Sequence, residues 1–203
     1  MILELDPIDP EHWIAQEAVR VLCRGGVVAL PTDTVYGVAC DIENESAVQR
    51  IYRLKGMDPK KLLSILCSDL TMAARYTMGI PTQWFRILKR ELPGPYTFIL
   101  PASKELPRAM LKQRKTVGIR VPDCPIALEL IRQLGRPLLS TSIRMGESQW
   151  LNDPAEIEEY YRHELDLVID GGVLIPEPST VVDFSGREPE LVREGKGRTD
   201  FLQ

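Results

Sequence analysis

Histidine is scarce in this sequence, because only His12 and His163 occur among 203 residues. Both lie in polar stretches with helical periodicity, where a solvated side chain is the ordinary outcome. A zinc site built on histidine, or a Ser-His-Asp triad, therefore has almost no support. The two commonest phosphate-binding loops, GxxxxGKS/T and GxGxxG, are also missing. A nucleotide site would have to use Arg or Lys side chains, hydroxyls and backbone amides in another arrangement.

Long apolar runs and paired cysteines are absent as well. Runs such as residues 27–30 have the length of a strand and fall far short of a membrane span. The N-terminal segment has no basic region and no long apolar run, so we expect no signal peptide. No CxxC pair occurs, and an apolar segment contains or adjoins each cysteine: Cys23, Cys40, Cys67 and Cys124. Reduced core thiols are favoured over disulfides, and we expect a cytoplasmic protein with no membrane contact.

The composition is that of a globular domain. Hydrophobic residues make up 44% and charged residues 27% of the chain. A chain of this length buries roughly 70% of its unfolded surface, so we expect one domain over residues 1–203 that needs no disulfide or metal to fold. The net charge of −4 argues against a protein coated in positive charge but allows a local basic groove.

Strand and helix signals alternate along the chain. Helix starts are marked by a capping side chain or a proline before an apolar stripe, at Asp9-Pro10, Asn44, Asp69, Thr82, Pro125 and Asp153-Pro154. Strands are predicted over residues 27–30, 36–42, 62–67, 96–100, 117–121, 137–143, 167–169, 180–184 and 191–193. Interleaved strands and helices predict an α/β fold, and the strand-rich C-terminal part favours a mixed sheet.

Five segments place polar groups at the ends of apolar strands. They are residues 31–37 (PTDTVYG), 115–122 (KTVGIRVP), 138–144 (LLSTSIR), 178–183 (PSTVVD) and 192–195 (VREG). Open α/β sheets bind ligands where strands end, so a sheet could bring these groups to one cavity.

Each segment also has a purely structural interpretation. The first could be a tight turn capped by threonine and aspartate. Arg120, inside an apolar strand, must reach an anion or a water-filled cavity, or else form a structural salt bridge. The hydroxyls before Arg144 could cradle an anion, or the strand could simply run into a polar loop.

Basic residues cluster on an otherwise acidic chain. Between residues 104 and 120 the only acid is Glu105, and the basic residues are Lys104, Arg108, Lys112, Arg114, Lys115 and Arg120, with Arg86, Lys89 and Arg90 nearby in sequence. Residues 153–170 are strongly acidic. Such runs are usually solvated faces, but this asymmetry is also typical of a groove that binds polyphosphate or RNA.

Six motifs, in order over nearly the whole chain, resemble the YrdC/YciO family. They are residues 31–37 (PTDTVYG), 94–97 (GPYT), 118–122 (GIRVP), 140–142 (STS), 178–183 (PSTVVD) and 192–195 (VREG). Residues 93–100 (PGPYTFIL) and 139–142 (LSTS) are most similar to the YciO branch. The resemblance implies a twisted mixed sheet flanked by helices, with a concave central cavity.

The YrdC branch makes threonylcarbamoyl-adenylate from threonine, bicarbonate and ATP and releases pyrophosphate, and the product serves the threonylcarbamoyl modification of tRNA adenosine. The resemblance implies that Thr34, Arg120, Ser142 and Ser179 hold threonine. It implies a nucleotide site at Thr116, Ser140 and Arg193. Magnesium would come with ATP as substrate, and no tightly bound cofactor or dedicated metal site is expected.

The sequence departs from the YrdC branch at four positions. Its Lys-x-Arg motif reads Lys55-Gly56-Met57, which keeps the expected catalytic lysine but loses the arginine. Its Ser-x-Asn motif ends in Arg144, and Leu66 and Lys61 stand where a histidine and an asparagine are expected. Methionine cannot donate to phosphate, whereas Arg144 or Lys61 could restore positive charge from a new direction.

Two functions follow from this pattern. In the first, the chain is a YciO-type nucleotide- and RNA-binding protein linked to this tRNA modification, with weak or altered synthase activity. In the second, it is a fully active L-threonylcarbamoyladenylate synthase. Thr34, Arg120, Ser142 and Arg193 permit synthase activity. Met57 and Arg144 favour the first function.

Overall fold

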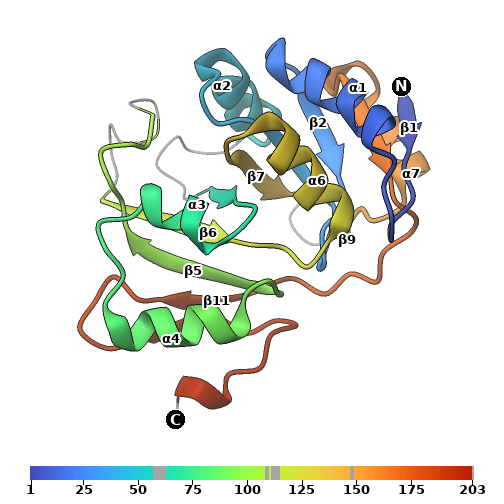
Figure 1. The fold of residues 1–203 in the computed structure, drawn as a ribbon. Coiled ribbons are helices and arrows are strands. Elements are labelled where there is room, and N and C mark those ends of the chain that lie inside the picture. The colour runs from blue at the N-terminus through green and yellow to red at the C-terminus, as the bar shows by residue number, and fades with distance from the viewer. Residues whose placement is uncertain (57–62, 108–109, 111–114, 147–148, 203) are drawn as a thin grey trace.

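The computed structural model describes residues 1–202, apart from 57–62, 108–109, 111–114 and 147–148. One mixed sheet has the strand order β1-β10-β2-β3-β7-β4-β6-β5-β11-β12. Its strands are β1 (Ile2–Glu4), β2 (Val27–Leu30), β3 (Gly37–Asp41), β4 (Ser64–Leu66), β5 (Tyr96–Pro101), β6 (Thr116–Arg120), β7 (Leu138–Ser142), β10 (Leu167–Asp170), β11 (Thr180–Asp183) and β12 (Glu190–Arg193). The predicted mixed α/β fold is confirmed (Figure 1).

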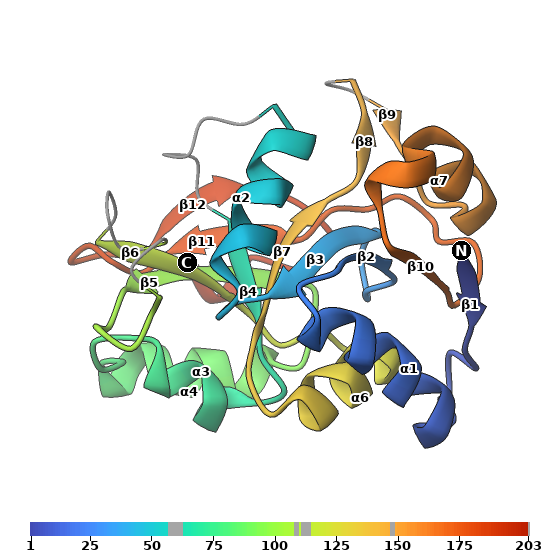
Figure 2. The ribbon, with the colours of Figure 1, turned by 90° about the horizontal axis from the view of Figure 1, so that it is seen from above.

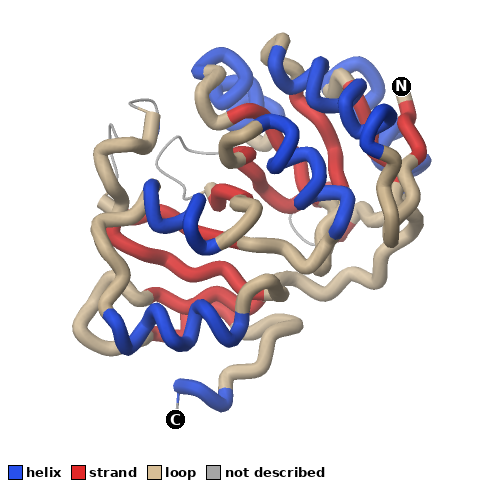
Figure 3. The backbone as a smooth tube through the Cα atoms, viewed as in Figure 1, coloured by secondary structure: helices blue, strands red, loops and turns tan. Residues whose placement is uncertain are grey.

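Helices lie on both sides of the strands (Figures 2 and 3). They are α1 (His12–Cys23), α2 (Glu45–Leu54), α3 (Leu70–Arg75), α4 (Thr82–Glu91), α6 (Pro125–Leu134) and α7 (Pro154–Tyr161), with the 3₁₀ turns η1 (Arg162–Glu164) and η2 (Asp200–Leu202). In the view of Figure 2, α1, α6, α3 and α4 lie below the sheet, and α2 and α7 lie above it. None of the helices in the described ranges has the length and apolarity that crossing a membrane requires.

Capping side chains set the starts of three of the six α-helices in the described part of the chain. The Asn44 side chain accepts a hydrogen bond from the Ala47 amide at 3.0 Å. Asp69 and Asp153 cap α3 and α7 in the same way. The expectation for α1 was wrong, because the helix begins at His12 and the amide of Asp9 instead donates to Asp6 in a preceding turn.

Two apolar cores flank the sheet. One joins α1 and α6 to the β2 and β3 side chains, and the other packs α2, α4 and α7 against the opposite face. Cys40, Cys67 and Cys124 are buried free thiols, as predicted. Cys23 is exposed at the end of α1, so its assignment to the core was wrong.

Register across the central strands separates the two faces of the sheet. One row carries small or polar residues and Ile99, in the order Ala39, Ser140, Ser64, Gly118, Ile99. The next row points the other way and is apolar throughout: Cys40, Leu139, Ile65, Ile119 and Phe98. Helices α1 and α6 cover the first face at Ala39, whereas the other members of that row line an open cavity: Ser140, Ser64, Gly118 and Ile99.

The twist of the sheet explains how this row stays open. Trp84 on α4 stacks on Phe184, which in turn stacks on Phe98, so α4 covers the opposite face from α1 and α6. In Figure 2, α1, α6 and α4 nevertheless lie on one side of the molecule, as a strongly twisted sheet allows. At the β5–β11 end the polar face therefore turns away from the side on which these three helices lie.

Three short strands escaped the sequence prediction. Strand β1 pairs with β10 at one edge of the sheet. Strands β8 (Arg144–Met145) and β9 (Gln149–Trp150) form a separate two-stranded hairpin. Each is only two or three residues long, so its alternation is too short to recognise in a sequence.

The cap of α2 generates a stability prediction. Asn44→Ala removes the acceptor for the Ala47 amide and should lower the free energy of unfolding by about 1 kcal/mol. Asp9→Ala is the matched control, because Asp9 is exposed and does not cap α1, and it should change stability by less than about 0.5 kcal/mol. Urea unfolding of both variants makes the comparison, and equal stability of the two would contradict the capping assignment.

Candidate functional site

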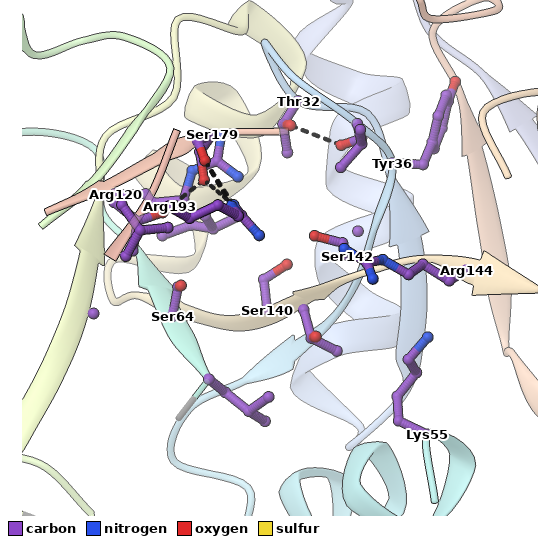
Figure 4. Close-up of a pocket in the computed structure, with 18 of the residues that line it drawn as sticks. Thr32, Tyr36, Lys55, Ser64, Arg120, Ser140, Ser142, Arg144, Ser179 and Arg193 are labelled. Atoms are coloured by element: carbon purple, nitrogen blue, oxygen red, sulfur yellow. Dashed lines mark hydrogen bonds between the residues drawn. The ribbon is translucent and has the colours of Figure 1, made fainter. Parts of the chain in front are cut away.

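A cavity of about 820 Å³ opens over the polar face of the sheet (Figure 4). Its wall comes from the loop after β2, the end of α2 and strands β4, β5, β6, β7, β8, β11 and β12. These elements are distant in sequence, and all five polar segments that the sequence singled out contribute to it. The expected concave central cavity is thus present.

Two glycines keep the floor of the cavity open. A Cβ atom at Gly37 would lie 2.7 Å from Ser140 Oγ. One at Gly118 would lie 3.2 Å from both Ser64 Oγ and Thr97 Cγ2. A larger residue at either position would displace the hydroxyls that line the floor.

Arg120 at the end of β6 forms a buried ion pair. Its Nη2 donates to Asp33 Oδ1 at 2.8 Å and to Thr34 Oγ1 at 3.0 Å. The two charged side chains are only 9% and 7% exposed. Burial lowers the pKa of Arg120 and the Asp33 carboxylate opposes this shift, so the guanidinium keeps its charge. The salt bridge that the sequence left open as an alternative is therefore formed.

The ion pair does not use all of its polar atoms. Arg120 Nε and Asp33 Oδ2 are buried and lack a hydrogen-bond partner within the described residues. Buried polar groups in proteins are nearly always paired, and an unpaired one needs an explanation such as a bound ligand. Here one unpaired atom is a donor and the other an acceptor, which together match a zwitterion.

Ser179 and Arg193 form a second polar contact on the wall. Arg193 donates to the Ser179 carbonyl oxygen from Nε at 3.1 Å and from Nη2 at 2.6 Å, and to Ser179 Oγ at 3.0 Å. The same Oγ lies 2.9 Å from Thr97 Oγ1. Gly195 allows this close approach, since a Cβ there would lie 2.3 Å from the Pro178 carbonyl oxygen.

The cavity carries a concentration of positive charge. Lys55, Arg120, Arg144 and Arg193 line it, and within the described residues its lining includes no Asp or Glu. Figure 4 shows the ends of the Lys55, Arg144 and Arg193 side chains directed toward the cavity. Burial, followed by the charges of Arg144 and Arg120, lowers the pKa of Arg193. Such a field favours an anionic ligand.

Most of the residues predicted for the site are brought together. Those that line the cavity are Lys55, Arg120, Ser140, Ser142, Arg144, Ser179 and Arg193. Thr34 lies behind Arg120 and acts on the cavity through it. Thr116 begins β6 two residues before Gly118 and is not part of the lining. Lys61 and Met57 fall outside the described residues, and the chemical roles of all these residues stay predictions.

Several polar residues of the site had received no role of their own from the resemblance, among them Thr32, Asp33, Thr97 and Ser64. Asp33 and Thr97 were each part of a quoted motif, and their partners Arg120 and Ser179 are far away in the chain. Ser64 is the first residue of β4, an ordinary apolar strand, and carried no signal of its own. Only its pairing with Ser140 and Gly118 places it on the floor.

Comparison with known proteins supports the family resemblance. The Sua5_yciO_yrdC family, described as telomere recombination, matches residues 20–195. The uncharacterized protein YciO of Escherichia coli (strain K12) is 39% identical over 195 residues, which cover 95% of this chain and 94% of YciO. The crystal structure of E. coli YciO superposes with a TM-score of 0.94 at 36% identity and covers 100% of this chain and 99% of that one.

Relatives with a named activity or ligand are also similar. A threonylcarbamoyl-AMP synthase of Halorhodospira halophila is 34% identical over 156 residues, which cover 77% of this chain and 82% of the synthase. The crystal structure of P. abyssi Sua5 complexed with L-threonine has a TM-score of 0.89 at 31% identity and covers 96% of this chain and 57% of that one. The chain belongs to the Sua5/YciO/YrdC family, as a YciO-like member related to the threonylcarbamoyl-AMP synthases.

Proposed function

We propose that the cavity binds L-threonine around Arg120 and the phosphates of ATP around Arg193, Arg144 and Lys55. The protein would be a cytoplasmic YciO-type nucleotide- and RNA-binding protein, linked to threonylcarbamoyladenosine modification of tRNA, with weak or altered threonylcarbamoyl-AMP synthesis. The observation that carries the proposal is the cavity lined by four cations. One of them, Arg120, keeps a buried donor without a partner in the described part of the chain, next to the unpaired buried acceptor of Asp33.

The threonine half of the proposal rests on the Arg120–Asp33 pair. An amino-acid carboxylate accepts readily from a guanidinium, and Arg120 Nε is the donor left over. Asp33 Oδ2 is the matching acceptor for an amino group. The Thr32 and Ser179 hydroxyls lie on the same cavity wall and can bond to the hydroxyl of threonine. The related P. abyssi Sua5 was crystallised as a complex with L-threonine, which supports this choice of ligand.

The nucleotide half rests on the remaining cations. In the proposed reaction an oxygen of the carbamate group of threonylcarbamate attacks the α-phosphorus of ATP. The bond from that phosphorus to the oxygen that bridges it to the β-phosphorus breaks, and pyrophosphate leaves. Negative charge develops on the phosphate oxygens, and nearby fixed cations stabilise it. Lys55, Arg144 and Arg193 would supply that charge, and magnesium would enter with ATP through its phosphate oxygens.

The cavity lining also carries two departures from the YrdC branch. Leu66 lines the cavity where a histidine was expected, and Arg144 lines it where an asparagine was expected. Losing one preorganised polar contact in a transition state lowers a rate by roughly a hundredfold or more. A fully active synthase is the second candidate, supported by the presence of Arg120, Ser142 and Ser179 in the cavity lining.

A direct assay separates the two candidates. The purified protein, given threonine, bicarbonate, magnesium and ATP, should form threonylcarbamoyl-AMP and pyrophosphate about a hundredfold more slowly than the H. halophila synthase under the same conditions. Equal rates would establish the fully active enzyme instead. No product above background, with the control active, would remove synthase activity from the proposal and leave ligand binding to be measured alone.

Threonine binding should depend on Arg120. Replacing Arg120 with alanine removes a charged hydrogen bond to the carboxylate and should weaken threonine binding by at least about tenfold to a hundredfold. Isothermal titration calorimetry measures the affinity, and thermal melting checks the fold because Asp33 loses its partner. Arg86→Ala, an exposed arginine on α4, is the control and should bind normally. Unchanged affinity in a folded Arg120→Ala protein would overturn the carboxylate assignment.

RNA binding stays a prediction that rests on the basic cluster. Its described members Arg86, Lys89, Lys104 and Lys115 are exposed, whereas Arg120 is buried in the cavity and does not belong to that surface. Arg108, Lys112 and Arg114 fall outside the described residues. A surface of this kind binds RNA through phosphates, with affinity that falls as salt rises.

Titration of tRNA at several salt concentrations tests this prediction. The slope of log K against log salt should flatten by about 1–2 in the Arg86→Ala/Lys89→Ala double variant, since each phosphate contact contributes about 0.7–0.9. The Arg20→Ala/Arg24→Ala pair on α1 is the control of equal charge change and should retain the wild-type slope. Absence of binding, or binding insensitive to salt, would exclude the basic surface as an RNA site.

A further inference from the structure

The hairpin of β8 and β9 places an aromatic ring against a cavity cation. Arg144 and Trp150 face each other as a cross-strand pair. The Arg144 guanidinium carbon lies 3.7 Å from the centre of the Trp150 ring. Tryptophan is the best aromatic partner for a cation, and a contact of this kind contributes about 0.5–2 kcal/mol. Trp150 itself is not part of the cavity lining.

The backbone on both sides of Arg144 is anchored to the fold. The Ile143 amide donates to the Tyr36 carbonyl oxygen at 2.9 Å, and Ile143 is fully buried. The Tyr161 hydroxyl donates to the Arg144 carbonyl oxygen at 3.4 Å. After β9, Asn152 accepts from the Tyr36 amide at 3.1 Å. The base of the hairpin is thus fixed, so the contact with Trp150 bears on the orientation of the Arg144 side chain and not on its backbone.

The orientation of the Arg144 side chain matters because Arg144 shares the cavity with other cations. Arg193 lies close enough for the charge of Arg144 to lower its pKa. Repulsion within the cavity would drive an unrestrained arginine side chain out toward water. The Trp150 ring attracts the guanidinium on one flat face and opposes this escape. The N–H groups of a guanidinium lie in its plane, so they stay available at the edge of the stack.

We propose that Trp150 is a positioning residue that holds Arg144 for contact with the phosphate chain of a nucleotide, so that the cavity prefers polyphosphate to monophosphate ligands. The inference rests on the proposed nucleotide site and adds to it a residue outside the cavity and a preference among ligands. Arg144, Arg193 and Lys55 together are matched by the several charges of a triphosphate and only partly by the charge of one phosphate.

Binding of a nucleobase is the alternative role for the Arg144–Trp150 stack. A nucleobase could lie on the guanidinium face opposite the ring, and the stack would then recognise adenosine rather than phosphate. The positive charge around Arg144 favours the phosphate assignment. Ligands that carry only one of the two groups separate these uses, because tripolyphosphate has no base and adenosine has no phosphate.

Calorimetric titration of the full chain with ATP, AMP, tripolyphosphate, adenosine and L-threonine tests the inference. Trp150→Leu should weaken ATP and tripolyphosphate binding by about 3- to 30-fold, the factor that a lost cation–π contact supports. AMP should lose less, and threonine affinity should not change. Trp150→Phe keeps an aromatic face and should restore most of the loss. Trp13→Leu, at a tryptophan 69% exposed on α1, is the matched control.

A double-variant cycle shows whether Trp150 acts through Arg144. Once Arg144→Ala has removed the cation, adding Trp150→Leu should cause no further loss of tripolyphosphate affinity. A parallel loss of threonine affinity and thermal stability in Trp150→Leu would make the residue purely structural. Selective loss of adenosine would favour base stacking instead. Unchanged ATP affinity in Trp150→Leu would overturn this inference but not the proposed nucleotide site. A wild-type protein that binds neither ATP nor tripolyphosphate would overturn the nucleotide site itself.

Discussion

The ion pair between Arg120 and Asp33 joins the end of β6 to the loop between β2 and β3, across 87 residues of chain. Desolvation of two nearly buried charges offsets much of their attraction, so such a pair contributes little net stability. Its importance lies in geometry. The pair fixes the guanidinium beside the Thr34 hydroxyl and leaves Arg120 Nε and Asp33 Oδ2 without a partner within the described residues. Threonine recognition, as proposed, depends on this arrangement.

Three cavity arginines are held by three different kinds of partner. Arg120 pairs with a carboxylate, Arg193 with a backbone carbonyl and Arg144 with the face of an aromatic ring. The described lining of the cavity contains four cationic side chains and no carboxylate, so its potential is positive. An incoming anion would relieve the repulsion among these groups, and a chain of phosphates would relieve it most. The arrangement of partners thus favours the charged end of a nucleotide without a glycine-rich loop.

The cavity combines residues that the YrdC branch shares with residues that depart from it. The expected Arg120, Ser142 and Ser179 line it, and so do Leu66 and Arg144, which replace the expected polar residues. The two kinds are interleaved, because Leu66 pairs with Arg120 across β4 and β6 and Ser142 is two residues from Arg144. This mixture is consistent with a YciO-like member of the family. The hairpin that carries Arg144 also provides Trp150, so the substitution comes with its own support.

The sequence by itself determined what depends on neighbours along the chain. Asn44 caps α2 because its acceptor needs only an amide three residues away, and the apolar runs predicted the central strands because burial imposes their pattern. The ordered motifs identified the family and most of the cavity residues. Only the tertiary structure decided the features that depend on how strands pair and pack: the Arg120–Asp33 pair, the place of Ser64 in the floor, the exposure of Cys23 and the ring of Trp150 on Arg144. These features follow from strand register and packing, which a local sequence pattern leaves undetermined.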